Sequence, residues 1–397
     1  MCRFLLVSLK MDAILGEVTI RQRRKKLDEM TQGSGLSDAY TVTLTRLKAQ
    51  KGYRSALGLK VLMWVLYSER PLRAEELCHA LGVGIGSADL DPENIPALRT
   101  ILASCLGLIT VEASSSTFRL LHFALQEHLS RDLTLFHSPH SIIAEVCLTY
   151  FNFRYVRDLS PTLRSGPTTV PLLEYASVYW GRHTKKGMTE NIKILSLRLL
   201  DGFSQHISAQ LLLLHYSQSS GEGPWFYGVG GPKRFTGLHR IAFLGIAGIV
   251  STVLEMKEWD VNAEDCVGMT ALTWASRRGH EEIVKQLLEQ EGVNPNQADA
   301  EYGQTPLLLA VENGYEGIIK MLLAREDVNP NQADTEYGQT PLSWAVEKGR
   351  EGIVKMLLEQ EDIDPDQPDT QYGQTPLLLA TENGDEGIIK MLYNEET

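Results

Sequence analysis

One sequence unit returns every 34 to 35 residues over roughly the last 160 positions of this 397-residue chain. The run Tyr-Gly-Gln-Thr-Pro-Leu at 302–307 recurs at 337–342 and 372–377, and weaker copies begin near Gly268 and Thr236. A short unit of this period cannot bury its own apolar face, so it is stable only when stacked on neighbouring copies. The chain is therefore expected to end in an array of about five stacked repeats.

The capping residues of one unit predict a short first helix. Thr340 can accept a hydrogen bond from an unpaired backbone N–H at the helix start, and Pro341 occupies the first helical position, where no N–H is needed. Leu342, Trp344 and Ala345 then follow at positions expected to be buried. The copies share a small residue inside this helix, namely Ala242, Ala275, Ala310, Ala345 and Ala380. In the last four copies a glycine follows four residues later, at Gly279, Gly314, Gly349 and Gly384.

These glycines are expected to end the first helix in the left-handed conformation, which costs other residues on the order of 1 kcal/mol. A second apolar block, such as 352–358, predicts a second helix. The segment 362–373 is rich in Pro, Gly and Asp and predicts an extended, hairpin-like connection. The last copy, ending in the run 391–394, is expected to lack a complete second helix.

This order of Thr-Pro-Leu, small residue, glycine and second apolar block resembles the ankyrin repeat. The resemblance implies a solenoid of stacked helix pairs with hairpin-like loops, at residues 233–397, that binds other proteins. Ankyrin units usually carry His after Thr-Pro-Leu, whereas this chain has Leu308, Ser343 and Leu378. The hydrogen bonds between neighbouring loops are therefore expected to differ from the usual pattern at three interfaces.

Two surfaces of such an array remain free for a partner: the loop tips and the exposed ends of the first helices. The tips carry Gln297, Asp299, Glu301, Tyr302, Gln332, Asp334, Glu336, Tyr337, Gln367, Asp369, Gln371 and Tyr372. The helix ends carry Glu312, Asn313, Glu347, Lys348, Glu382 and Asn383. Because tyrosine offers a large contact area at small entropic cost and carboxylates attract cations, Tyr302, Tyr337 and Tyr372 are predicted to anchor a basic or extended peptide. Recent duplication alone would also explain their similarity.

The net charge of -12 hides a gradient along the chain. Residues 1–60 contain 12 Lys/Arg and 5 Asp/Glu, whereas residues 236–397 contain 11 and 30, so no nucleic-acid binding by the array is expected. The five cysteines are scattered without paired metal-ligand spacing, which is typical of reduced, intracellular thiols. No apolar run approaches the roughly 18 residues of a membrane span. A cytoplasmic protein without a membrane segment is expected.

Residues 1–52 predict two helices, the first broken near 32–35. The opening residue lies inside an apolar helical pattern, so the chain is expected to begin partway into a larger domain. The basic run from Arg21 to Lys26 is either a solvated helix face or a patch for nuclear import or phosphate binding.

Residues 53–135 predict a winged helix. Helices are expected at 57–67, 74–81 and 91–104, followed by a hairpin of 108–111 with 117–121. A winged helix that reads DNA needs basic residues on its third helix, where Arg99 stands alone. A nuclear DNA-associated regulator is therefore the weakest of the alternatives.

The run Leu121 to Leu129 resembles the winged-helix signature of the NACHT signalling NTPases, including NLR-like receptors of fungi. The resemblance implies that His122 contacts the β-phosphate of ADP when an NTPase domain is supplied. Phe123 stands where that family often has Asp. No phosphate loop of the form Gly-x-x-x-x-Gly-Lys-Ser/Thr occurs in the chain. The resemblance thus covers the C-terminal part of a NACHT-ankyrin protein, with residues 1–52 as a remnant of the NTPase lid.

Residues 136–232 are expected to form a helical connector with helices at 142–151, 171–180, 192–203 and 207–216. Its second helix carries apolar residues that suit either a partner groove or a packed core. The Gly- and Pro-rich segment 221–232 is the expected hinge.

No arrangement of the ten histidines places a base beside a nucleophile, and His137 and His140, in an expected loop, lack further ligands for a metal. The chain is therefore expected to be neither an enzyme nor a carrier of a cofactor or metal. The first hypothesis is a non-catalytic scaffold or sensor that binds a macromolecular partner through its repeats. The alternative is a regulatory fragment that acts in trans on a full-length NACHT NTPase through its winged-helix stem.

Overall fold

The computed structural model of this chain describes residues 18–31, 36–132, 135–160, 163, 165–200, 206–220, 234–256 and 259–395. The fold is mostly helical, as predicted, and the described residues contain one two-stranded sheet. The chain divides into two compact units. Unit 1 comprises residues 1–156 and 166–192, and unit 2 comprises 157–165 and 193–397. The connector expected at 136–232 is shared between the two units.

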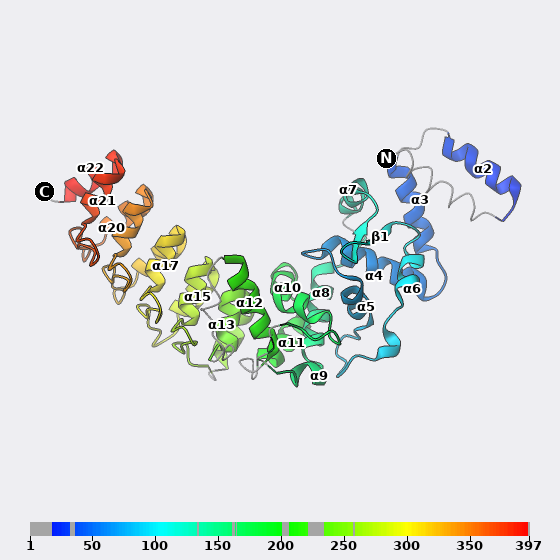
Figure 1. Cartoon of the computed structure of the whole chain (residues 1–397), viewed down its shortest axis with the longest axis horizontal. Helices are drawn as coiled ribbons and strands as arrows, with labels where there is room; N and C mark the ends of the chain where they lie inside the picture. The colour runs from blue at the N-terminus through cyan, green and yellow to red at the C-terminus, as the bar shows by residue number, and fades with distance from the viewer. Residues whose placement is uncertain are drawn as a thin grey trace. The chain divides into compact units, whose positions relative to one another are not determined.

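The three helices and the hairpin of the predicted winged helix lie in unit 1 (Figure 1). They are α4 (Tyr53–Tyr67), α5 (Ala74–Gly82), α6 (Leu98–Ser104), β1 (Ile109–Glu112) and β2 (Thr117–Leu120). The strands pair antiparallel with Ile109 opposite Leu120, and a bridge joins Arg73 to Thr117. Leu57, Val61, Leu77, Ile101 and Phe118 are buried in the core of this module.

The third helix is shorter than predicted. Asp91 does cap a helical start, but it caps only the 3-10 turn η1 (Pro92–Asn94). The residue before a proline disfavours the helical conformation, so Pro96 separates this turn from α6, which begins at Leu98. The capping signal was therefore correct and the predicted length of the helix was wrong.

The remaining helices of unit 1 flank the winged helix on both sides in sequence. They are α2 (Ile20–Thr31), α3 (Leu36–Lys48), α7 (Phe123–Arg131), α8 (Pro139–Phe151), α10 (Leu173–Lys186) and, at the boundary of the unit, α9 (Arg154–Arg157). The second connector helix, α10, buries Leu173, Tyr175 and Trp180, so its apolar face belongs to the core and is not an open groove. His140 lies in the first turn of α8, which corrects the expected loop at this position.

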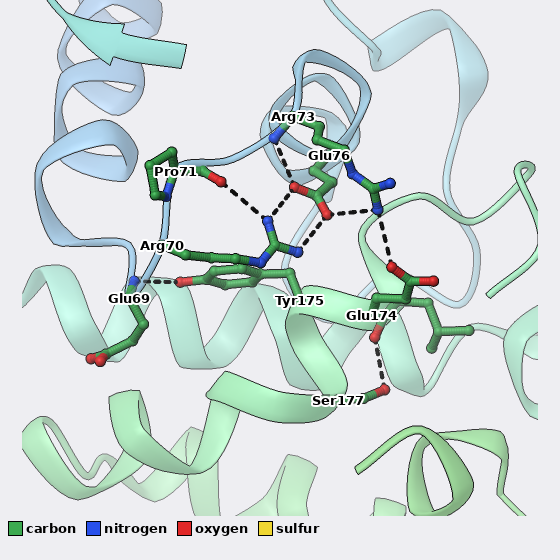
Figure 2. A network of polar contacts seen from close by, with 9 residues as sticks. Glu69, Arg70, Pro71, Arg73, Glu76, Glu174, Tyr175 and Ser177 are labelled. Carbon is green, nitrogen blue, oxygen red and sulfur yellow. Dashed lines mark hydrogen bonds and ion pairs between the residues drawn. The ribbon is translucent and has the colours of Figure 1, made fainter. Parts of the chain in front are cut away.

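A buried carboxylate joins the α4–α5 connection to α10 (Figure 2). Glu76 is fully buried and accepts from both guanidinium nitrogens of Arg70 at 2.7 and 2.8 Å. It also accepts from the backbone N–H of Arg73 at 2.7 Å. The Arg73 side chain in turn lies 3.1 Å from Glu174, and Arg70 stacks over the ring of Tyr175. This network helps to fix α10 against the winged helix.

A chain of hydrogen bonds continues from this network into α8. The Glu69 backbone N–H donates to the Tyr175 hydroxyl at 3.1 Å, and that hydroxyl lies 2.9 Å from Nε2 of His183. Nδ1 of His183 lies 2.8 Å from Nδ1 of His140. Burial lowers the pKa of His183 to about 3, so His183 is neutral inside the fold.

Unit 2 contains five helix pairs that stack side by side (Figure 1). They are α13 (Gly237–Leu244) with α14 (Ala247–Glu255), α15 (Ala271–Arg278) with α16 (Glu281–Leu288), α17 (Pro306–Asn313) with α18 (Glu316–Leu323), α19 (Pro341–Glu347) with α20 (Glu351–Leu358), and α21 (Pro376–Asn383) with α22 (Glu386–Glu395). Two further helices precede them, α11 (Glu190–Leu200) and α12 (Ile207–Ser220). We number the pairs copy 1 to copy 5. The expected hinge at 221–232 lies outside the described residues.

The predicted caps are present in these helix pairs. Thr340 accepts at 3.1 Å from the backbone N–H of Ser343, and the predicted glycines have positive φ angles, such as +78° at Gly314. Copy 1 also ends its first helix at a glycine, Gly245, which was missed because Ala242 was taken as the equivalent of Ala275. Ile241 holds that position instead, since its carbonyl accepts from Gly245 as that of Ala275 accepts from Gly279.

The expected truncation of the fifth copy is wrong. Its second helix, α22, spans ten residues, whereas α16, α18 and α20 span eight. Ile388 and Leu392 are buried, so α22 contributes its apolar face to the core like the other second helices. All five copies are therefore complete helix pairs.

Candidate partner-binding surface of the repeat array

A row of asparagines joins the loops of neighbouring copies. Asn296 donates to the carbonyl of Asp327 in the next loop at 2.6 Å and accepts from the backbone N–H of Asn329 at 2.8 Å. Asn331 repeats both bonds one copy later. At the equivalent place in copy 5 stands Asp366, whose carboxylate has no N–H to donate.

Backbone hydrogen bonds hold each loop in its hairpin-like turn and against its neighbour. Within copy 4 the N–H of Asp334 donates to the carbonyl of Gln339 at 3.0 Å. Between copies the N–H of Thr335 donates to the carbonyl of Tyr302 at 2.7 Å, and Thr370 does the same to Tyr337 at 3.0 Å. Copies 3 to 5 thus keep bonded loops without the histidine of the usual ankyrin pattern.

In copy 1 a histidine does hold the loops together. Nε2 of His239 lies 2.9 Å from the carbonyl of Ala263 and 3.0 Å from that of Met269 in the next copy. Burial lowers the pKa of His239 to about 4, which keeps the ring neutral. The predicted change in loop bonding therefore applies to Leu308, Ser343 and Leu378, but not to copy 1.

The three aspartates of the predicted tip surface are committed to the fold. Asp299, Asp334 and Asp369 are 7%, 5% and 4% exposed. Oδ1 of Asp334 accepts from the backbone N–H groups of Glu336, Tyr337 and Gly338 at 2.6 to 3.1 Å. A carboxylate that satisfies several buried backbone donors is needed for the turn itself. Little of these three aspartates is therefore open to a partner, in contrast to the expectation from the sequence.

The three predicted tyrosines differ in how far they face the solvent. Tyr302 is half-buried, whereas Tyr337 is 37% and Tyr372 is 73% exposed. Beside Tyr337, a hydrogen bond to Glu336 raises the pKa of the tyrosine hydroxyl, which stays neutral and able to donate. The aromatic part of the predicted surface is thus most open on copies 4 and 5.

The tips and the helix ends are brought together by glutamines that the sequence reasoning did not single out. Gln339 donates to Glu347 at 2.9 Å and Gln374 donates to Glu382 at 2.9 Å, while Gln304 and Glu312 lie 3.4 Å apart. The signal was present in the sequence, because a glutamine precedes Thr-Pro in all three copies. Each predicted helix-end glutamate therefore lies beside its own loop tip.

Lys348 and Trp344 of copy 4 place a cation next to an aromatic ring. The Lys348 ammonium lies 3.1 Å from Glu347 and 4.8 Å from the centre of the Trp344 ring. Trp344 lies on the face that was expected to be buried, but it is only half-buried, so part of the residue is open. Its indole N–H donates to Oδ2 of Asp334 at 2.9 Å, which fixes the ring against the loop.

The predicted nucleotide-contacting residue lies in unit 1. His122 caps α7, because its Nδ1 accepts from the Ala124 N–H at 3.1 Å. It lines a cavity of about 490 Å³ together with Arg70, Arg119 and the exposed ring of Phe123. Both arginines already pair with carboxylates, Arg70 with Glu76 and Arg119 with Glu112.

The other sequence predictions concern charge and ligands. Arg21, Arg24 and Lys25 are exposed on α2, which agrees with a solvated helix face as well as with a recognition patch. Among the described residues no group of three or more His, Cys, Asp or Glu is placed to hold a metal ion. None of the described helices has both the length and the apolar character that crossing a membrane requires.

Comparison with known protein families agrees with the two modules described above. The family model for ankyrin repeats (3 copies) matches residues 238–334 and 326–397. The family model for the GPI inositol-deacylase winged helix domain matches residues 45–142, which extend from α3 into α8. No curated protein matches the chain. The chain therefore carries ankyrin repeats and a winged helix domain of the GPI inositol-deacylase type.

Proposed function

We propose that this chain is a non-catalytic interaction scaffold or sensor in NLR-like signalling, and that its repeat array binds a basic or extended peptide segment of a protein partner. The observation that carries the proposal is the pair of open tyrosines on successive loops, Tyr337 and Tyr372. Glu336, Glu347 and Glu382 are exposed close to these loops in sequence or through the glutamine bonds. Ankyrin repeats generally mediate protein binding, which supports this function.

Charge and contact area contribute to binding at different stages. Residues 236–397 carry 30 Asp/Glu against 11 Lys/Arg, so the array attracts a basic segment from a distance. Aromatic rings then supply most of the binding free energy, because tyrosine loses little rotational freedom on contact. The buried aspartates contribute indirectly by holding the loops that present the tyrosines.

The test replaces Tyr302, Tyr337 and Tyr372 with Ala and measures binding of an identified basic partner by calorimetry. We expect a loss of about 2 kcal/mol or more, the scale of hot-spot residues. Tyr393 is 55% exposed and belongs to the second helix of copy 5, α22, and not to a loop, so Tyr393→Ala is the matched control and should leave affinity unchanged. Equal affinity of the folded triple variant and the parent would remove the tip surface from the proposal.

A second candidate function is regulation in trans of a NACHT NTPase through the winged-helix stem. The position of His122 on a cavity lined by arginines is the observation that favours it. If the stem acts in this way, the full chain should bind a purified NACHT NTPase more tightly with ADP than without nucleotide. His122→Ala should abolish that difference, and an ADP effect that persists in the variant would exclude this role of His122.

A further inference from the structure

Copies 2 and 4 contain the same tryptophan arrangement. Trp274 and Trp344 both stand four residues after the capping threonine. In each copy the indole N–H donates at 2.9 Å to an aspartate of the preceding loop, Asp265 or Asp334. The two rings are therefore held in the same way, on the same side of the first helix.

In copy 2 this tryptophan is covered by another part of the chain. Tyr216 of α12 lies edge-on to Trp274, with ring centres 6.2 Å apart, and edge-on to Phe243, with centres 5.1 Å apart. The guanidinium of Arg278 lies 5.1 Å above the Tyr216 ring and 4.8 Å above that of Phe243. Trp274 is fully buried as a result of this packing. Figure 1 shows α12 beside α13 and α15.

In copy 4 the same arrangement is open. Lys348 stands at the position of Arg278, eight residues after the capping threonine, and its ammonium lies directly over the Trp344 ring. Trp344 is half-buried, whereas Trp274 is fully buried. The cation thus covers a docked tyrosine in copy 2 and covers the tryptophan itself in copy 4.

One of the neighbours that differ between the two sites sets the chemistry of the ligand. The position that Phe243 holds in copy 1 is held by Glu312 in copy 3, the copy that precedes Trp344. Glu312 is half-buried and its side chain lies 3.4 Å from Gln304. A ring that entered the copy 4 site would therefore have a carboxylate on one side, where the copy 2 site has an aromatic ring.

We propose that Trp344 and Lys348 form a docking site for a tyrosine presented by a helix of a partner protein, with a lysine or arginine beside the tyrosine to pair with Glu312. The packing of Tyr216 on Trp274 shows within the same molecule what such a site accepts. An edge-on aromatic pair and a cation over the ring are each favourable beyond simple area burial. The inference rests on the proposed function and deepens it, since it adds a specific docking site to the acidic array.

The experiment uses two synthetic helical peptides and the full chain. One peptide presents a single tyrosine flanked by lysines, with an apolar face copied from the sequence of α12, and the other has alanine in place of the tyrosine. The parent should bind the tyrosine peptide at least tenfold more tightly than the alanine peptide by calorimetry. Equal binding of the two peptides to the parent would overturn the proposal without any variant.

The matched variant is Trp344→Leu with Lys348→Asn. Copies 3 and 5 already carry leucine and asparagine at these positions, as Leu309, Asn313, Leu379 and Asn383, so the substitutions suit the fold. The variant should lose the tenfold preference for tyrosine, and retention of the preference would refute the docking site. The triple alanine variant of the tip tyrosines should keep the preference, so failure of this proposal and failure of the tip surface are distinguishable.

Discussion

The residue that follows the first-helix glycine affects the stability of the contact between its copy and the preceding copy. In copy 4 this residue is Arg350, whose two terminal nitrogens each donate at 2.8 Å to the carbonyls of Val311 and Glu312 at the end of α17. In copy 5 it is Asp385, which lies against Gly349 at the end of α19. A helix C-terminus carries partial negative charge, so it favours a guanidinium and disfavours a carboxylate.

Substitutions of these two residues should change the stability of the contacts between copies in opposite directions. Hydrogen bonds to a charged group contribute about 1.5 to 3 kcal/mol when buried, and Arg350 is half-buried, so Arg350→Ala should destabilise the contact between copies 3 and 4 by about 1.5 kcal/mol. Asp385→Arg should stabilise copy 5 by about 1 kcal/mol, because it removes an unfavourable charge and supplies donors to the carbonyls at the end of α19. Asp385→Ala removes only the charge and should give about 0.3 kcal/mol.

Hydrogen exchange followed by mass spectrometry on the full chain is the appropriate measurement, because terminal repeats open independently of the rest of an array. In the parent chain, exchange should be fastest after Gly384, since copy 5 packs against copy 4 alone within this chain. Asp385→Arg should slow exchange in α21 and α22 by about fivefold, as 1.4 kcal/mol corresponds to tenfold. Exchange in copy 5 that is the same for Asp385→Arg and Asp385→Ala would refute the helix-end argument.

The remaining predictions concern the loops, the buried network of unit 1 and nucleotide binding. Asn331→Ala should lower the stability of the contact between copies 4 and 5 by about 1 to 2 kcal/mol, because two hydrogen bonds are lost. Asp366→Asn is the control: this chain has no following loop for it to bond, so hydrogen-exchange rates should stay unchanged. Glu76→Gln should destabilise unit 1 by about 2 kcal/mol in urea unfolding, since it removes the buried carboxylate that accepts from Arg70 and from the backbone N–H of Arg73. Unit 1 should lose stability as the pH falls below 6.5, because burial holds the pKa of folded His183 at about 3 and also lowers the pKa of His79 and His140, so the unfolded state binds more protons. His183→Gln should make that loss smaller between pH 6.5 and 4.5. Burial alone would raise the pKa of Glu76, but the hydrogen bonds from Arg70 and Arg73 lower this pKa overall. A second loss of stability should therefore begin below pH 4.5, and it should be absent in Glu76→Gln. Finally, the chain should not bind ATP with micromolar affinity in calorimetry, because its sequence has no phosphate loop.

Local signals explain what could be predicted from the sequence. Thr340 and Pro341 at a helix start, and Gly314 at a helix end, each act within one turn of the backbone, so their effect is visible without knowledge of the fold. The hairpin of the winged helix was predictable for the same reason. The shortened third helix shows the limit of this reasoning, since Asp91 and Pro96 gave conflicting local signals and the proline decided the outcome.

Burial of charged residues was the part that the sequence did not reveal. Asp334 and Glu336 are two residues apart in one loop, yet the first is buried and bonded to the backbone while the second is exposed. The spacing of an aspartate four residues before a positive-φ glycine, as in Asp334 and Gly338, is the signal that would have separated them. In unit 1 the partners of Arg73 and Glu69 include Glu174 and Lys186, about a hundred residues away, and no local pattern predicts such pairs.

The two proposed surfaces fall on the same copies for a structural reason. In copies 1 and 2 the aromatic positions of the first helices are used inside the molecule, where Phe243 and Trp274 pack against Tyr216 of α12. Copy 2 has Val267 where copies 3 to 5 have the tip tyrosine. The aromatic positions that α12 covers in copies 1 and 2 are therefore open only in later copies. A partner that contacts both Trp344 and Tyr372 would bind copies 4 and 5 together. Binding across this contact should therefore also reduce opening of copy 5.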